Sequence, residues 1–276
     1  MDLFQAVILG LIQGVTSWLP VSSKTQVLLF GTLLFNLPFH DLLSFALIVH
    51  IGDLLALFVM FKKEYISLLK VRPKTSDLKN FAILDGDKKL AYYVIFSVIA
   101  TAIIALPLYL LVRHSLSELS GTLFLFFTGV MLLAMSVISK ASGSKSQPAK
   151  LTVKSAALTG AAQGLAVLPG ISRSGITSSS LLLQGVKQDE AIKLAFIIGT
   201  PMIILALIVF QFTDGYTGLT LPIVVAGIAV SMITSYVTMN VMLKIAQRVK
   251  FYWFTIAFAL LAMTPLAIQL LFPFLN

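Results

Sequence analysis

Long apolar runs separated by short polar loops make up most of this chain. Six runs are long enough, or nearly long enough, to cross a bilayer: residues 42–61, 90–112, 119–139, 194–211, 219–242 and 251–272. A transmembrane helix needs about 20 consecutive apolar residues, because the hydrocarbon core of a bilayer is about 30 Å thick. The pattern therefore predicts an all-α polytopic membrane protein with six transmembrane helices.

Two further apolar segments, residues 3–30 and 155–186, are interrupted by proline and resemble each other. The first reads Gly10-Leu-Ile-Gln13-Gly14 and then Leu19-Pro20-Val21-Ser22-Ser23. The second reads Gly160-Ala-Ala-Gln163-Gly164 and then Leu168-Pro169-Gly170-Ile171-Ser172-Arg173-Ser174. Both contain GxxQG, then LP, then hydroxyl residues, which indicates an internal repeat.

The two arms of each broken segment are too short to span a bilayer, since a helix rises about 1.5 Å per residue. We therefore expect two re-entrant helical hairpins, with ordinary proline-kinked spans as the alternative. Free backbone groups at membrane depth are tolerated only where they line a cavity or are buried in protein. Matched broken segments in two halves predict a binding site near the bilayer midplane, where the hairpin tips meet.

Basic residues predict the orientation of the spans. The loop 62–89 holds eight Lys or Arg, 140–154 holds four, 187–193 two and 244–250 three, whereas 113–118 holds only Arg113. The positive-inside rule places the four basic loops in the cytoplasm and both termini outside. An inverted-topology repeat follows, with residues 1–139 as the first half, 140–154 as a basic cytoplasmic linker and 155–276 as the second half.

Composition agrees with the membrane assignment and excludes several functions. The chain is 58% hydrophobic and 11% charged, whereas soluble domains carry about 25% charged residues. The net charge of +9 is not a nucleic-acid signal, because it lies in loops between apolar runs. Cys is absent, so thiolate chemistry and Cys-ligated metal are excluded.

Arg173 is the charge that most strongly suggests a site. It stands in an apolar stretch at the tip of the second hairpin, where an arginine costs on the order of 3 kcal/mol. A helix N-terminus after Gly170, together with Arg173, would bind phosphate through backbone N–H groups and the bidentate guanidinium. Three hydroxyl residues are expected to assist: Ser172, Ser174 and Thr177. The alternative is an arginine satisfied by carbonyl groups.

The first hairpin tip supplies a second set of polar groups. Ser22, Ser23 and Lys24 follow Pro20 directly, so tips that meet would bring Lys24 close to Arg173. Gln13 and Gln163 precede the two breaks and could bond either the loop backbone or ligand oxygens. Alternatively, Lys24 extends to the outer surface along its own arm.

His50 and Asp53 lie in the middle of the run 42–61 and, three residues apart, share a helix face. An intramembrane aspartate is a functional candidate by default. Asp53 could neutralise Lys24 or Arg173, or accept a proton. The alternative for His50 is a core histidine bonded to a carbonyl.

Over its whole length the sequence resembles the undecaprenyl-diphosphate phosphatase family of the bacitracin-resistance type. Residues 169–177 fit that family's PGxSRSxxT motif at every fixed position, and residues 19–23 fit LPVSS. Gln13 fits the first position of [E/Q]xxxE. The resemblance implies removal of the terminal phosphate from a polyprenyl diphosphate, which recycles a carrier lipid for envelope glycan synthesis. It also implies the six spans and two hairpins given by the charge count.

Two positions depart from the family pattern. The family's glutamate, four residues after Gln13, is Ser17, and its histidine after the LPVSS serines is Gln26. In that family the glutamate and the histidine are the usual candidates for metal binding, general base or nucleophile. A cofactor, Mg²⁺ or Ca²⁺, is therefore implied here only by the resemblance. With Arg173, Ser23 as nucleophile and Asp53 as base are the remaining catalytic candidates. Ser17 and Gln26 are retained as phosphate-binding candidates.

Two functions from different classes therefore remain open. The first is a lipid diphosphate phosphatase in the plasma membrane. The second is a catalytically degenerate flippase or transporter of an isoprenoid phosphate or another anion, favoured by the inverted repeat and by Lys24. A cation channel fits poorly, since the predicted site is net positive. The expected partners are a polyprenyl phosphate lipid and the bilayer; a homodimer is left open, and nucleic acid is not expected.

Overall fold

The structure, a computed structural model, is all-helical in its described part, which contains no strand. It describes residues 1–19, 21–72, 77, 84, 86–112, 126, 129–130, 133–134, 136–137, 140, 151–168, 171–216, 218–246, 252–253, 256–257, 259–260 and 263–264. The elements are α1 (Leu3–Thr16), α2 (Ser23–Phe35), α3 (Phe39–Ile48), α4 (His50–Met60), α5 (Lys62–Lys70), α7 (Gly86–Val112), α9 (Val153–Gly164), η3 (Leu165–Val167), α10 (Arg173–Leu183), α11 (Gln188–Thr213) and α12 (Leu221–Ala246).

Four helical stretches are long and apolar enough to cross a membrane: Phe39–Met60, Gly86–Val112, Gln188–Thr213 and Leu221–Ile245. They correspond to four of the six predicted runs, so the prediction of a multi-pass helical membrane protein is confirmed. The first of them is interrupted at Val49, between α3 and α4. The runs 119–139 and 251–272 lie largely outside the described residues.

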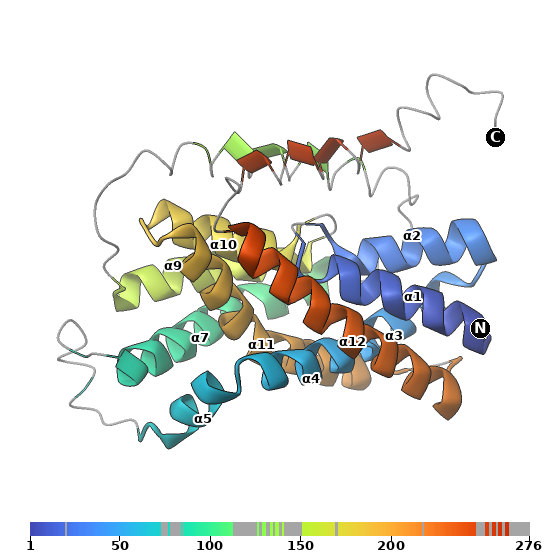
Figure 1. Cartoon of the computed structure of the whole chain (residues 1–276), viewed down its shortest axis with the longest axis horizontal. Helices are drawn as coiled ribbons and strands as arrows, with labels where there is room; N and C mark the ends of the chain where they lie inside the picture. The colour runs from blue at the N-terminus through green and yellow to red at the C-terminus, as the bar shows by residue number, and fades with distance from the viewer. Residues whose placement is uncertain are drawn as a thin grey trace.

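The two proline-broken segments each form a pair of short helices. Figure 1 shows α1 and α2 entering the bundle from one end and α9 and α10 from the other, with the two turns near the middle. These helices have 14, 13, 12 and 11 residues, all shorter than a span. This arrangement is the one expected of re-entrant hairpins, and the hairpins' depth in a bilayer stays a prediction, as do the repeat boundaries.

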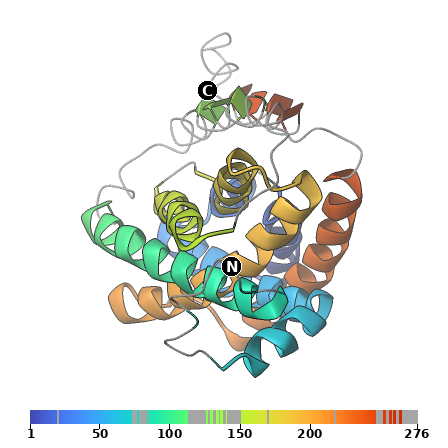
Figure 2. The same ribbon diagram turned by 90° about the vertical axis from the view of Figure 1, so that its left-hand side faces the viewer.

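Each pair packs against a span from the opposite half of the chain: α1 against α12, and α9 against α7. Both contacts depend on glycine. A Cβ on Gly14 would lie 2.7 Å from the carbonyl oxygen of Ser231, and one on Gly160 would lie 2.8 Å from the carbonyl carbon of Ser97. The glycines of the repeated GxxQG motif therefore allow close helix approach. Figure 2 shows the helix bundle from its end.

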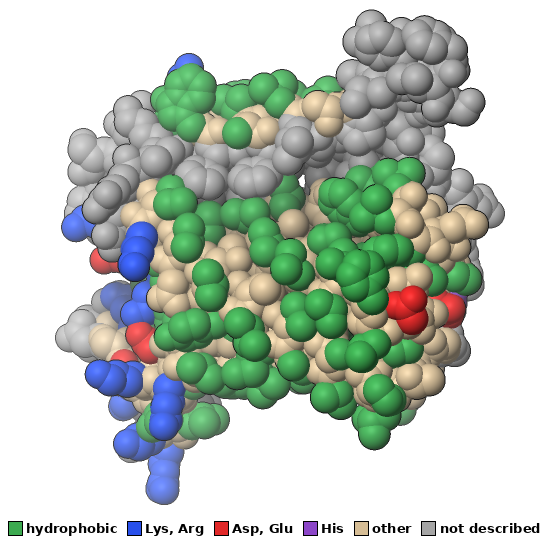
Figure 3. Space-filling view, turned by 45° about the vertical axis from the view of Figure 1, so that its right-hand side comes forward, with side chains coloured by type: hydrophobic (Ala, Val, Ile, Leu, Met, Phe, Trp, Pro, Cys, Tyr) green, Lys and Arg blue, Asp and Glu red, His purple; other side chains and the backbone are tan. Residues whose placement is uncertain are grey.

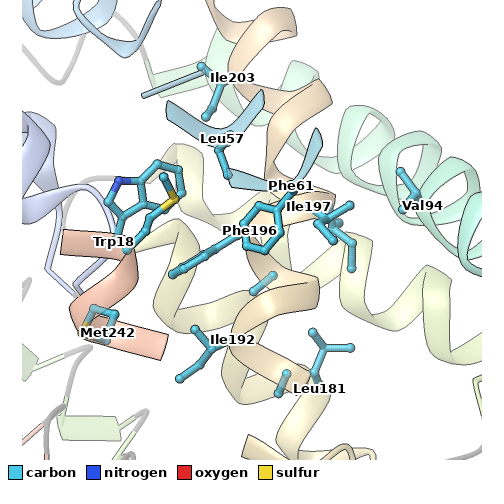
Figure 4. Packing of buried hydrophobic residues seen from close by; sticks show 14 of the residues in the cluster. Trp18, Leu57, Phe61, Val94, Leu181, Ile192, Phe196, Ile197, Ile203 and Met242 are labelled. Carbon is cyan, nitrogen blue, oxygen red and sulfur yellow. The ribbon is translucent and has the colours of Figure 1, made fainter. Parts of the chain in front are cut away.

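The largest buried cluster lies beneath the first break. Trp18 packs edge-on against Phe196 of α11, with ring centroids 4.8 Å apart. Leu57, Ile197 and Leu181 belong to the same cluster (Figure 4). On the outside, Figure 3 shows a hydrophobic belt with Lys and Arg gathered at one end. Charge at an end and apolar side chains between the ends are typical of a protein embedded in a bilayer.

Candidate functional site

The first break lies between α1 and α2, and the second between α9 and α10. A cavity of about 140 Å³ lies where these two breaks meet. The carbonyl oxygen of Leu19, in the first break, accepts hydrogen bonds from Ser172 at 3.4 Å and from Ser174 at 3.1 Å. These bonds join residues more than 150 positions apart in the chain. The expectation that the two tips meet is therefore met by direct contacts between them.

Two helix N-termini reach this cavity. Helix α2 begins at Ser23 and α10 at Arg173, and the cavity is lined by both residues and by Ser22, Ser172 and Ser174. The Ser172 hydroxyl caps α10 by accepting from the N–H of Gly175 at 3.4 Å, whereas Ser22 makes no capping bond. Free N–H groups and the helix dipole make such termini suitable for anions.

Lys24 and Arg173 both line the cavity. The ion pairs found within 4.0 Å among the described residues are Lys88–Asp77 and Lys193–Glu64, so neither cavity cation is paired with a carboxylate. Two partly buried positive charges at one point form an environment for a multivalent anion. Within the described part of the chain, no hydrogen bond engages the guanidinium of Arg173, so its donors can serve ligand oxygens.

An aromatic ring and a glycine hold Arg173 instead of an acid. Its Cζ lies 6.0 Å from the ring centroid of Trp18, at cation–π distance. Gly199 of α11 also lies beside it, where an added Cβ would come within 3.3 Å of the Arg173 Nε. Trp18 is only 2% exposed, so it is a rigid support for the guanidinium.

Asp53 is fully buried and accepts four hydrogen bonds. Its Oδ2 accepts from Gln13 Nε2 at 2.9 Å and from the Ser17 hydroxyl at 2.7 Å. Its Oδ1 accepts from Ser231 at 2.9 Å and from Ser235 at 2.5 Å, both on α12. Neutral donors thus satisfy the Asp53 carboxylate, and among the described residues no ion pair within 4.0 Å joins it to Lys24 or Arg173.

Ser17 connects this carboxylate to the cavity, because its hydroxyl bonds Asp53 while the residue lines the cavity wall. His50 also lines the cavity, and its Nδ1 donates to the carbonyl of Ala46 at 2.6 Å. The Nε2 of Gln13 lies 3.2 Å from both ring nitrogens of His50, and the buried Gln13 Oε1 has no hydrogen-bond partner among the residues that the structure describes. The bond to the Ala46 carbonyl agrees with the alternative given for His50, a core histidine bonded to a carbonyl.

Gln163 has the corresponding place in the second half. Its Nε2 donates to Thr101 of α7 at 3.1 Å, and its Oε1 accepts from Thr177 at 3.2 Å. Gln163 lines the cavity, whereas Thr177 is buried behind it. The two glutamines thus both support a break, but only Gln13 contacts a carboxylate.

The structure brings most of the predicted residues to one place. Nine line the cavity: Ser17, Ser22, Ser23, Lys24, His50, Gln163, Ser172, Arg173 and Ser174. Gln13, Asp53 and Thr177 lie one layer behind, and Gln26 lies on α2 away from the lining. Gly170 lies outside the described residues.

The residues of the site that were not predicted include Trp18, Thr101, Gly199, Ser231 and Ser235. Ser231 and Ser235 are four apart in the apolar run 219–242, so their place on one helix face was the available signal. Trp18 and Gly199 carry no such signal, because their role depends on where Arg173 lies.

A resident divalent metal does not fit the described residues. They contain no group of three or more His, Cys, Asp or Glu side chains arranged to hold a metal. Mg²⁺ and Ca²⁺ require several oxygen ligands, usually with carboxylates, but the one carboxylate near the cavity has both oxygens engaged. The cavity itself presents two cations.

Comparisons with known proteins identify the family of the chain. The family model described as bacitracin resistance protein BacA matches residues 6–264. The undecaprenyl-diphosphatase of Methanothrix thermoacetophila is 33% identical over 265 residues, covering 95% of this chain and 96% of that protein. The one from Haloarcula marismortui is 32% identical over 250 residues, covering 90% and 91%. The one from Saccharolobus islandicus is 40% identical over 195 residues, covering 69% and 67%. The chain therefore belongs to the bacitracin resistance protein BacA family.

Proposed function

We propose that this protein is an integral membrane phosphatase that removes the terminal phosphate of a polyprenyl diphosphate, of the undecaprenyl type. The observation that carries the proposal is the Ser17 hydroxyl. Ser17 lines a cavity that holds two cations and two helix N-termini, and its hydroxyl bonds the Asp53 carboxylate at 2.7 Å. The names of the similar proteins support the choice of substrate.

The phosphate-binding half of the reaction is assigned to the hairpin tips. Arg173 and Lys24 hold the oxygens of the diphosphate, with the hydroxyls of Ser22, Ser23, Ser172 and Ser174 and the N-termini of α2 and α10 around them. Phosphoryl transfer depends mainly on positioning and on stabilising charge over the phosphate oxygens. Ser23 is assigned to binding, because no base contacts its hydroxyl among the described residues.

The cleaving half is assigned to Ser17 and Asp53. A water oxygen bonds to the terminal phosphorus as the bond from that phosphorus to the bridging oxygen breaks. The bridging oxygen leaves with the electron pair on the lipid monophosphate, where Arg173 neutralises its charge. The water proton passes through the Ser17 hydroxyl to Asp53, which acts as general base. Such a base contributes about 10²–10⁴-fold to the rate.

Asp53 takes over the role of the family's glutamate in this proposal. The glutamate would stand at position 17, and the hydroxyl there now contacts a carboxylate supplied by α4. The histidine is replaced by Gln26, which lies away from the cavity lining. The proposed chemistry therefore uses protein groups alone.

A transporter of isoprenoid phosphate is the second candidate. It is favoured by the two helix pairs that enter from opposite ends and meet at a cavity with two cations, neither of which is paired with a described carboxylate. Midplane sites between inverted repeats are typical of transporters. In either case we place the protein in the plasma membrane with both termini outside.

The test is phosphate release from a prenyl diphosphate by purified protein in detergent. Release that depends on Asp53 and Arg173 supports the phosphatase. Binding of the lipid without release, combined with its movement across vesicles, supports the transporter.

A further inference from the structure

The cavity has one polar end and one apolar end. Its polar end holds Lys24, Arg173 and the serines of both breaks. From Gly199, beside Arg173, the same face of α11 continues through Met202, Ile203, Ala206 and Leu207, all four of which line the cavity. Residues spaced three to four apart share a helix face, and this stripe extends about 12 Å at 1.5 Å per residue.

Other elements add apolar side chains to the cavity lining. These are Ala105 of α7 and Ala166 and Val167 of η3. Ala206 is exposed although it lines the cavity. The apolar end, or apolar arm, therefore reaches the surface at Ala206, on a helix with the length and hydropathy of a membrane span.

We propose that this arm binds the first isoprene units of a prenyl chain whose phosphate lies at Arg173, and that the small side chain of Ala206 leaves the exit open. The inference rests on the proposed function in one respect, that a phosphate ester is held at Arg173. Charge complementarity places the phosphate at the cationic end, and the apolar arm beside it fits the attached chain. A polyprenyl chain is far longer than the cavity, so it continues past Ala206 into the lipid.

A binding experiment can test the arm without relying on turnover. The chain has two tryptophans, so a Trp253→Phe parent leaves Trp18 as the reporter, 6.0 Å from Arg173. Its fluorescence would be titrated with methyl phosphate and farnesyl phosphate at one fixed detergent concentration. The parent should bind farnesyl phosphate at least about tenfold more tightly, since burial of each CH₂ group favours binding.

Ala206→Phe on this parent should remove most of that preference, by closing the exit, and should leave methyl phosphate affinity within about twofold. Unchanged methyl phosphate binding also shows that the variant is folded. Ile208→Phe is the matched control, because Ile208 is 48% exposed on the same helix and does not line the cavity. It should leave the affinity for both ligands unchanged.

Three results would overturn the proposal: no prenyl preference in the parent, an intact preference in Ala206→Phe, or the same loss in Ile208→Phe. A loss of methyl phosphate binding in Ala206→Phe would also overturn it, since Ala206 would then act on the phosphate end. Failure of the phosphatase proposal is a separate result. A parent that prefers farnesyl phosphate but releases no phosphate from farnesyl diphosphate supports the arm and contradicts hydrolysis.

Discussion

The Ser17 hydroxyl lies 2.7 Å from the Oδ2 of Asp53, which joins the cavity wall to a fully buried carboxylate. Ser17 comes from the end of α1 and Asp53 from α4, while two further donors to the carboxylate come from α12. Three helices thus hold one acid behind a cavity with two cations. The proposed chemistry depends on this contact.

Replacing the acid should abolish turnover without abolishing binding. Asp53→Asn keeps the shape but removes the charge and one acceptor oxygen, so phosphate release should fall about 100-fold or more. The matched control is Ser231→Ala, which removes one of the four donors and should cost less than about tenfold. Phosphate release and lipid affinity would be measured for both variants. Equal turnover in Asp53→Asn and wild type would rule out Asp53 as the base.

Exchanging the serine and the carboxylate between positions 17 and 53 is a sharper test. Ser17→Glu with Asp53→Ser places the acid on α1, where the family has it, and should keep at least about a tenth of wild-type turnover. Each single change should be much less active. Asp53→Ser removes the base, and Ser17→Glu sets two carboxylates side by side. A double variant no better than Asp53→Ser would show that the two positions are not interchangeable.

Arg173 should control affinity for phosphate. Arg173→Ala should weaken lipid phosphate binding about tenfold or more, because a charge-assisted hydrogen bond contributes roughly 1.5–3 kcal/mol. Arg173→Lys should restore only part of the loss, since the bidentate fork is missing. Affinity would be measured by titration with a prenyl phosphate. If Arg173→Ala bound as tightly as wild type, the site assignment would fail.

Gly199 should affect binding through Arg173. A Cβ there would lie 3.3 Å from the Arg173 Nε, so Gly199→Val should displace the guanidinium and weaken phosphate binding about fivefold or more, at near-normal thermal stability. Exposed Ile208→Ala on the same helix is the control. In an Arg173→Ala background Gly199→Val should have little further effect, because coupled residues are not additive. Additive losses would contradict the coupling.

The absence of Cys allows a direct test of orientation. A single cysteine at Phe39, at the start of α3, should react with an impermeant reagent from outside. A cysteine at exposed Lys70, at the end of α5, should react only after the membrane is permeabilised. Labelling of both from one side would contradict the predicted topology.

Much of the architecture could be predicted because its signals are local. Apolar runs gave the four described spans, and the repeated GxxQG and LP segments indicated that Lys24 and Arg173 share a site. The repeat did not predict the hydrogen bonds of Asp53, because two of the donors, Ser231 and Ser235, are 178 and 182 residues away in the chain. The resemblance suggested roles for Gln26 and Thr177, but side-chain direction places neither in the cavity lining.

The residues that support the Arg173 side chain could not be predicted from the sequence either. A charge in an apolar stretch leads one to look for an acid nearby, and Asp53 was the obvious candidate. The structure instead places the ring of Trp18 and the space at Gly199 beside the guanidinium. Both depend on how α11 packs against the first break, which no local pattern encodes.

The most direct test of the central claim is phosphate release from farnesyl diphosphate by purified wild-type protein, compared with Asp53→Asn at matched lipid binding. The account predicts steady release by wild type and a loss of about 100-fold in the variant. Wild-type protein that binds the lipid but releases no phosphate above background would contradict it, and movement of a prenyl phosphate across vesicles by the same protein would establish the transporter instead.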